Sequence, residues 1–179
     1  MTVTTDIQLR PAQTDSVRLQ TRSGTAIIVR PATPDDMPVL SAFFDAVSDD
    51  DRRFRFLTAV THVNDEQLRP MVDVDHRQTD HFLAFDEAGV LAASAMLACD
   101  AAMERAEVAI SVRADHRGQG IGWTLLDHVR GVAKARGVRV LQSIENRQNR
   151  AAIGLEQEMG FTARPCEGDP ALVILEARF

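Results

Sequence analysis

The chain contains no tyrosine and only 2 cysteines, and its acidic residues outnumber its basic ones. Cys99 and Cys166 show neither a C-x-x-C spacing nor a cysteine–histidine pattern, so the sequence predicts no metal site. Lysine and arginine number 20 against 26 aspartates and glutamates, which gives a net charge of −6. A surface that binds nucleic acid is usually basic. We therefore expect no nucleic-acid partner.

Long apolar runs are also missing. The longest mostly apolar stretch, residues 88–99, is interrupted by Gly89 and Ser94, and the N-terminal segment contains no apolar leader sequence. A helix that spans a membrane needs about 20 consecutive apolar residues. We therefore expect no membrane partner and a cytoplasmic location.

The 179 residues are 45% hydrophobic and 26% charged, which is typical of one globular domain. A chain of this length buries roughly 70% of the surface that its unfolded form exposes, so its core needs no disulfide or structural metal. Residues 1–24 are polar and lack periodicity, and we predict an N-terminal extension that is either flexible or a peripheral strand. Residues 25–179 are then predicted to form one domain.

Local signals in the first half predict one strand followed by three helices. A β-branched run indicates a strand at residues 25–30. Thr33 precedes a proline and predicts the N-cap of a helix over residues 33–47. Ser48 predicts the N-cap of a second helix over residues 48–60, because the acidic residues after it suit the positive end of a helix dipole. Residues 64–72 are expected to form a third helix.

The second half begins with three strand-like runs, and short polar breaks between them predict an antiparallel meander. These runs span residues 81–87, 90–97 and 105–112. Apolar residues at helical spacing then predict a helix over residues 120–136. The remaining expected elements are a strand, a helix and a strand, over residues 139–144, 149–159 and 171–177. This order indicates a mixed α/β sheet rather than a doubly wound parallel sheet.

A glycine-rich turn links the meander to the helix at residues 120–136. Glycines let successive backbone N–H groups point at one centre, and a helix N-terminus adds positive potential there, so the turn is a candidate phosphate site. The dinucleotide pattern G-x-G-x-x-G and the Walker pattern with G-K-S/T are both absent. The spacing that is present is R-x-x-G-x-G, formed by Arg117, Gly120 and Gly122.

With this motif inside ISVRADHRGQGIG, the sequence resembles the GNAT superfamily of acyl-CoA N-acyltransferases. The segments IVRPATPDD and NRAAIGLEQEMGF are also similar to that family, so the resemblance covers residues 25–161. It implies an α/β (α+β) GNAT fold, in which a mixed, mostly antiparallel sheet carries helices on both faces. It also implies that residues 25–179 are a single acyltransferase domain with acetyl-CoA-dependent N-acetyltransferase activity.

The resemblance assigns acetyl-CoA, the acyl donor, to two neighbouring segments. The strand before the turn would pair with the pantetheine arm, and the backbone of the turn would bind the pyrophosphate. Asn149 matches a family position, where it would either contact the cofactor or cap the helix that follows. The cofactor-binding residues implied in this way are Ile110, Ser111, Val112, Arg113, Arg117, Gly118, Gln119, Gly120, Ile121, Gly122 and Asn149.

Glu107 is the general base that the resemblance implies, because many GNAT enzymes carry a catalytic glutamate in the strand that leads to the acyl-CoA loop. A lysine-like amine has a pKa near 10.4, so only about one molecule in 10³ to 10⁴ is free amine at pH 7. A base that takes the proton then contributes about 10²- to 10⁴-fold to the rate. A solvated strand residue is the alternative interpretation of Glu107, and Glu104 is the neighbouring candidate for the base.

The usual general acid of the family is a tyrosine seven residues after the matched asparagine, and in this chain that position holds Glu156. Since the chain lacks tyrosine, we expect the CoA sulfur to leave as a thiolate and to take a proton from water. A thiol pKa of about 8.5 keeps the cost of that route small. Glu156 is expected to be a surface helix residue, and Cys166 and His116 are further candidates for the acid.

A narrower resemblance, to the catalytic domain of bacterial Pat-type protein lysine acetyltransferases, rests on SDDDRRFRF, ERAEVAISV and ENRQNRAAIGLEQEMGF. It implies a protein lysine as acceptor, and a catalytic module without the additional domains that these enzymes often carry. A small-molecule amine acetyltransferase and a non-catalytic acyl-CoA sensor are the alternatives. The oligomeric state stays open, with a homodimer as one option.

The predicted helix after Ser48 would lie beside the acceptor site. Its three acids, Asp49, Asp50 and Asp51, would either attract a cationic acceptor or suit the helix dipole. Trp123 is expected to be a packing residue. The phenylalanines expected to pack the core behind the acceptor site are Phe43, Phe44, Phe54 and Phe56.

Overall fold

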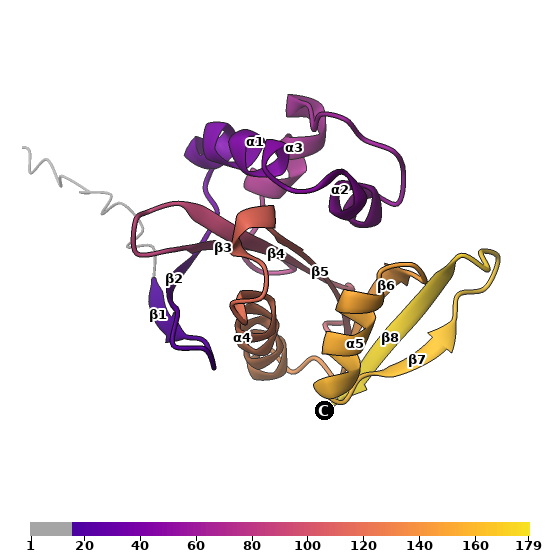
Figure 1. Cartoon of the computed structure of the whole chain (residues 1–179). Helices are drawn as coiled ribbons and strands as arrows, with labels where there is room; N and C mark the ends of the chain where they lie inside the picture. Colours follow the sequence, from indigo (N-terminus) through magenta and orange to yellow (C-terminus); the bar gives the residue numbers. More distant parts are fainter. Residues whose placement is uncertain (1–15) are drawn as a thin grey trace, which may run out of the picture.

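The computed structural model describes residues 16–179, in which eight strands form one sheet with five α-helices packed against it (Figure 1). The first 15 residues of the predicted N-terminal extension lie outside the described range. In the described part of the chain, every helix is too short or too polar to cross a membrane.

The sheet has the strand order β1-β2-β3-β4-β5-β6-β8-β7. Its strands are β1 (Val17–Gln20), β2 (Ala26–Pro31), β3 (Thr79–Phe85), β4 (Leu91–Cys99), β5 (Arg105–Val112), β6 (Val140–Asn146), β7 (Thr162–Pro165) and β8 (Leu172–Arg178). The α-helices are α1 (Met37–Asp45), α2 (Asp49–Phe56), α3 (Asp65–Val72), α4 (Ile121–Ala135) and α5 (Arg150–Glu158). Short 3₁₀ turns precede α1 and follow β5.

All neighbouring strands are antiparallel except β5 and β6, so the mixed, mostly antiparallel sheet is confirmed. The parallel pairing of β5 with β6 is short, and its three residue pairs are Arg105–Val140, Ala106–Leu141 and Glu107–Gln142. Beyond the Glu107–Gln142 pair the two strands continue without pairing to each other. The sheet is therefore split between β5 and β6.

Helices lie on both faces of the sheet, as predicted, with α1 to α3 on one face and α4 and α5 on the other (Figure 1). The α4 face is an apolar cluster in which Leu125 and Val129 meet strand residues such as Leu141. On the opposite face, Leu40 and Leu68 belong to a second buried cluster. These two clusters hold the helices against the two faces of the sheet, on either side of the split between β5 and β6.

The predicted starts of the second and third helices are confirmed, whereas the segment after Thr33 begins with a 3₁₀ turn, Pro34–Asp36, and α1 starts only at Met37. Thr33 forms a capping box with Asp36, the Ser48 hydroxyl accepts a hydrogen bond from the backbone of Asp51, and Asn64 caps α3. Helix α2 ends at Phe56, before the predicted end at residue 60. The short strand β7 was not predicted, because its four residues are all exposed and show no alternation.

Candidate active site

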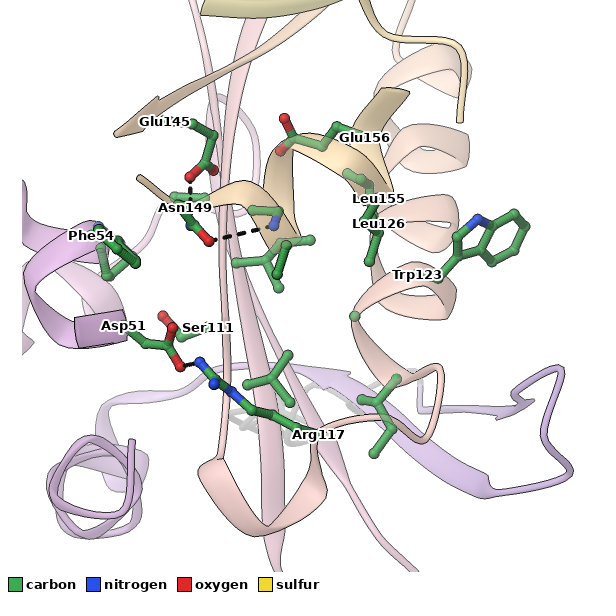
Figure 2. Close-up of a pocket in the computed structure, with 18 of the residues that line it drawn as sticks. Asp51, Phe54, Ser111, Arg117, Trp123, Leu126, Glu145, Asn149, Leu155 and Glu156 are labelled. Carbon is green, nitrogen blue, oxygen red and sulfur yellow. Dashed lines mark hydrogen bonds and ion pairs between the residues drawn. The ribbon is translucent and has the colours of Figure 1, made fainter. Parts of the chain in front are cut away.

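Where β5 and β6 separate, the structure contains a cavity of about 360 Å³ (Figure 2). Its walls come from the free parts of the two strands, from the glycine-rich loop, and from α2, α4 and α5. The glycine-rich loop lies at one end of this cavity. The Glu107–Gln142 pair, where the strands part, marks the closed end of the split.

The glycine-rich loop is held in a tight curl before α4. Gly118 and Gly120 have φ values of +73° and +76°, in the left-handed region that favours glycine. The loop rests on the turn between β1 and β2, because the Ser23 hydroxyl donates to the Gln119 carbonyl oxygen at 2.7 Å. The first backbone N–H groups of α4 have no acceptor within the helix, so this end of the cavity is suited to an anion.

Most of the residues assigned to acetyl-CoA by resemblance lie together. Those that line the cavity are Ile110, Ser111, Val112, Arg117, Gly118, Gly120, Ile121, Gly122 and Asn149. Arg113 and Gln119 are outside its lining, since Arg113 Nε donates to Asp115 Oδ1 at 2.8 Å and the Gln119 carbonyl oxygen accepts from Ser23.

Ser111 offers an independent test of whether a ligand fits between the strands. Its side chain is buried in the cavity wall, and its Oγ has no hydrogen-bond partner among the described residues. A buried hydroxyl left without a partner costs about 1–3 kcal/mol. The amides and the carbonyl of an acyl-pantetheine arm are partners of the right kind, so the residues present fit acetyl-CoA.

Across the cavity, Arg117 of the loop forms an ion pair with Asp51 of α2 (Figure 2). The other two acids of that helix pair locally, Asp49 with Arg52 and Asp50 with Arg53. Of the three acids in the first turn of α2, Asp51 is therefore the one that connects to the glycine-rich loop.

Glu107 lies at the closed end of the split, in the last residue pair between β5 and β6. Its side chain is exposed, and it is outside the lining of the cavity. Because its neighbours Ala106 and Val108 are buried in the cluster with α4, Glu107 faces the side of α2. Burial lowers the pKa of Arg55 on α2, whereas the negative charges of Glu107 and Glu145 oppose that shift. Arg55 is therefore within electrostatic reach of both carboxylates.

The expectation that Glu156 is a surface residue is wrong. Its side chain is 6% exposed and lines the cavity from α5, where Glu156 Oε2 accepts a hydrogen bond of 2.7 Å from the Ser143 hydroxyl. Burial raises the pKa of Glu156 to about 7, against the lowering effect of the hydrogen bond from Ser143. This carboxyl group therefore exchanges its proton near neutral pH.

Asn149 joins the cavity wall to a second carboxyl group, that of Glu145, which the sequence analysis did not identify. Asn149 Oδ1 accepts from the backbone of Ala152, so the residue caps α5. Its Nδ2 donates to Glu145 Oε2 at 2.8 Å (Figure 2). Burial raises the pKa of Glu145 to about 8, and the nearby Glu156 adds to that shift. Glu145 lies in a run of polar residues, ENRQN, that is typical of a solvated turn.

The predicted packing of the aromatic residues in the core is only partly confirmed. Phe43 and Phe44 are buried in the core, and the Phe56 ring packs edge-on against Phe44 at 5.4 Å between ring centroids. Phe54 instead lines the cavity, because α2 turns this side chain towards the split. Trp123 packs against the apolar cluster on the α4 face, as predicted, and it also contributes to the lining of the cavity; Figure 2 shows its side chain at α4.

Comparison with known proteins agrees with this geometry. Residues 43–161 match the Acetyltransferase (GNAT) family. An acetyltransferase of Pseudomonas aeruginosa is 28% identical over 154 residues, which cover 84% of this chain and 83% of that protein.

Two solved structures share the fold. The GNAT domain of S. lividans PAT has a TM-score of 0.85 at 25% identity, with 95% of this chain and 99% of that chain covered. A GCN5-related N-acetyltransferase from Kribbella flavida has a TM-score of 0.68 at 23% identity, with 86% and 98% covered. The family match spans well over half of the chain, and the shared fold agrees with it. The chain therefore belongs to the GNAT family and is an acetyl-CoA-dependent N-acetyltransferase.

Proposed function

We propose that the protein transfers acetyl to the ε-amine of a protein lysine, with Glu107 as general base and residues 25–179 as one acyltransferase domain. The observation that carries this proposal is the position of Glu107, exposed at the closed end of the split on the side of α2. A long side chain from another protein is able to reach a carboxylate in that position. The resemblance to Pat-type enzymes and the similarity to the GNAT domain of S. lividans PAT support a lysine acceptor.

Acetyl-CoA supplies the acetyl thioester for this transfer. The loop at residues 117–122 would hold its pyrophosphate through backbone N–H groups and through the Arg117 side chain. The edge of β5 at residues 109–112, which has no strand partner towards β6, would pair with the amides of the pantetheine arm. The Ser111 hydroxyl would then gain the hydrogen-bond partner that it lacks.

Arg55 and Glu107 together favour removal of the proton from the acceptor. The Arg55 guanidinium disfavours a second positive charge nearby, so it lowers the pKa of an approaching ammonium group. Glu107 then accepts the proton, directly or through a water molecule. Arg55 and Glu107 would together raise the fraction of the lysine acceptor that is present as free amine at neutral pH.

Release of the CoA thiol from acetyl-CoA, measured with different acceptors, tests the proposal. The acceptors are lysine-bearing proteins, the same proteins with their lysines blocked by reductive methylation, and free polyamines and amino acids. The chain contains one lysine, Lys134, on the exposed side of α4, so Lys134→Arg removes its own ε-amine from the assay. Release that requires unblocked protein lysines supports the proposal. Release with free small amines alone overturns the lysine assignment and leaves the acetyltransferase activity intact.

A further inference from the structure

Two carboxyl groups, one buried and one half-buried, face the cavity from the side of β6 and α5, and the lysine proposal uses neither. They belong to Glu145 and Glu156 (Figure 2). A carboxyl group removed from water is costly unless it is paired or protonated. Since neither carboxyl forms an ion pair within the described residues, both are available for proton transfer.

Of the two, Glu156 is hydrogen-bonded to a strand residue next to the point where the strands separate. Its partner Ser143 directly follows Gln142, the last residue of β6 that pairs with β5. Glu145 is two residues farther along β6, where the amide of Asn149 holds it. The hydrogen bond from Ser143 therefore fixes Glu156 at the closed end of the split.

The reacting sulfur is expected at the same end. The pyrophosphate of acetyl-CoA is drawn to the glycine-rich loop and the N-terminus of α4, at the other end of the cavity. A pantetheine arm that runs from there along the free edge of β5 carries its thioester to the closed end. Glu107 lies there on the α2 side of the sheet, and Glu156 lies there on the α5 side.

We propose that Glu156 is the proton donor to the sulfur of the departing CoA. In the step that it serves, the amine nitrogen forms a bond to the acetyl carbonyl carbon, and the bond between that carbon and sulfur breaks. The sulfur keeps the electron pair, and the Glu156 carboxyl gives its proton to it. The proton lost by the amine goes to a base on the acceptor side, and Glu156 is protonated again from solvent before the next turnover.

The hydrogen bonding of Glu156 suits this role. Its Oε2 accepts from the Ser143 hydroxyl, which leaves Oε1 as the oxygen free to carry and donate the acidic proton. A pKa of about 7 also lies close to the operating pH, where a general acid is most effective.

The charged surroundings of Glu156 come from several elements. The other ionisable side chains in the cavity lining are those of Asp51, Arg55, His116, Arg117 and Glu145. Arg130 of α4 donates to the Met159 carbonyl oxygen near the end of α5, so it lies behind the helix rather than in the cavity. Glu145 is the other acid in this part of the lining, and burial together with the charge of Glu156 raises the pKa of Glu145 to about 8, so Glu145 stays mostly protonated while Glu156 exchanges its proton.

Glu156→Gln tests the role, because glutamine keeps the size of the side chain and the acceptor for Ser143 but has no acidic proton. Glu158→Gln, at an exposed position of the same helix, is the matched control. With saturating substrates, the ratio of wild-type to Glu156→Gln kcat is expected to be about tenfold to a hundredfold near pH 6. As Glu156 ionises in the wild type, this ratio falls towards one by about pH 9, whereas the Glu158→Gln ratio stays near one throughout.

A second measurement follows the protonation state of the Glu156 carboxyl group directly and needs no catalysis. Infrared difference spectra between low and high pH should show a carboxylic acid band that titrates near neutrality. This band should be weakened by Glu156→Gln and kept by Glu158→Gln. The affinity for acetyl-CoA, measured by calorimetry, should change less than threefold in Glu156→Gln, since the residue acts on the leaving group.

The proposal is overturned if Glu156→Gln keeps the wild-type kcat across the pH range, or if its titrating band is undiminished. A constant loss of kcat at every pH would also overturn it, because that result indicates a packing role. Glu156 acts on the departing sulfur, so its role is the same for any amine acceptor. Its failure would leave the assignment of the lysine acceptor and of Glu107 untouched.

Discussion

Arg117 and Asp51 form an ion pair that joins the glycine-rich loop to the first turn of α2 across the cavity. The Arg117 side chain is 52% exposed and that of Asp51 18% exposed, so the arginine is accessible to an incoming ligand. A pyrophosphate carries more negative charge than one carboxylate and competes with Asp51 for the guanidinium. If Arg117 binds the pyrophosphate as proposed, cofactor binding is therefore coupled to α2, the helix beside the proposed acceptor site.

Arg117→Ala is expected to weaken acetyl-CoA binding by about tenfold to a hundredfold, because a charge-assisted hydrogen bond contributes about 1.5–3 kcal/mol. Isothermal titration calorimetry measures the change directly. Arg53→Ala is the control, since that arginine lies on α2 and contacts Asp50 and Gln148 instead of the loop. Asp51→Asn should tighten binding, because it frees Arg117 and removes a competing charge. Unchanged affinity in Arg117→Ala would show that the backbone alone holds the pyrophosphate.

Glu107→Gln is expected to lower kcat by about 10²-fold and to leave the dissociation constant of acetyl-CoA unchanged. The carboxylate faces the acceptor side, so its loss affects proton transfer from the amine rather than cofactor binding. Glu104→Gln is the matched control, because Glu104 is exposed, precedes β5 and interacts with Arg139. Equal kcat values for Glu107→Gln and the wild type would remove Glu107 from the role of base.

Gly120→Ala should destabilise the fold by about 1–2 kcal/mol, because its φ of +76° strains any residue with a Cβ. The added Cβ would also lie 3.4 Å from the Thr21 Cβ, in the turn that supports the loop. In contrast, Gly131→Ala lies within α4 in open space and should stabilise the protein by about 0.5–1 kcal/mol. Urea denaturation of both variants gives the two free energies of unfolding. A Gly120→Ala variant as stable as Gly131→Ala would contradict the strained loop geometry.

His116 links the loop to the turn after β3, since its Nε2 contacts Asp86 Oδ2 at 2.9 Å and its Nδ1 contacts Asp115 Oδ1 at 2.8 Å. Burial lowers the pKa of His116, but the hydrogen bonds to Asp86 and Asp115 outweigh it and leave the pKa raised. The same contacts lower the pKa of both aspartates, with burial opposing the shift at Asp86.

The sign of the pH effect follows from these shifts. A raised histidine pKa stabilises the fold below its unfolded value of about 6.5, and this contribution is lost as the pH rises through the folded pKa. The lowered aspartate pKa values stabilise the fold above about pH 4, and that contribution is lost in acid. The melting temperature of His116→Gln should therefore fall furthest below that of the wild type at about pH 5–6, with a smaller gap at pH 8. A gap that widens with pH would contradict the ion pairs.

The caps and the glycine-rich loop could be predicted from the sequence because each depends on a few neighbouring residues. Thr33, Ser48 and Asn64 bond to backbone groups three residues away, and Gly120 adopts a local conformation that other residues avoid. Such signals need no knowledge of the tertiary structure.

Glu156 and Phe54 were mispredicted because their environment is made by other elements. A glutamate on a helix is usually solvated, and the hydroxyl that accommodates Glu156 comes from Ser143 on a neighbouring strand. Phe54 is a large apolar residue of the kind that usually packs in a core, but the split between β5 and β6 places a cavity where the core would continue. The position of that split depends on strand register, which local patterns do not encode.

The short pairing of β5 with β6 also has a thermodynamic consequence. In the described sheet, this pairing is the only strand contact between the unit of β6, β7, β8 and α5 and the rest of the domain. A ligand bound in the split contacts both units and binds only while they are docked, so it opposes their separation by mass action. At a concentration of 100 times Kd, that stabilisation is about 2.7 kcal/mol. An acyl donor bound in the split would thus shift the equilibrium of the C-terminal unit towards its docked form.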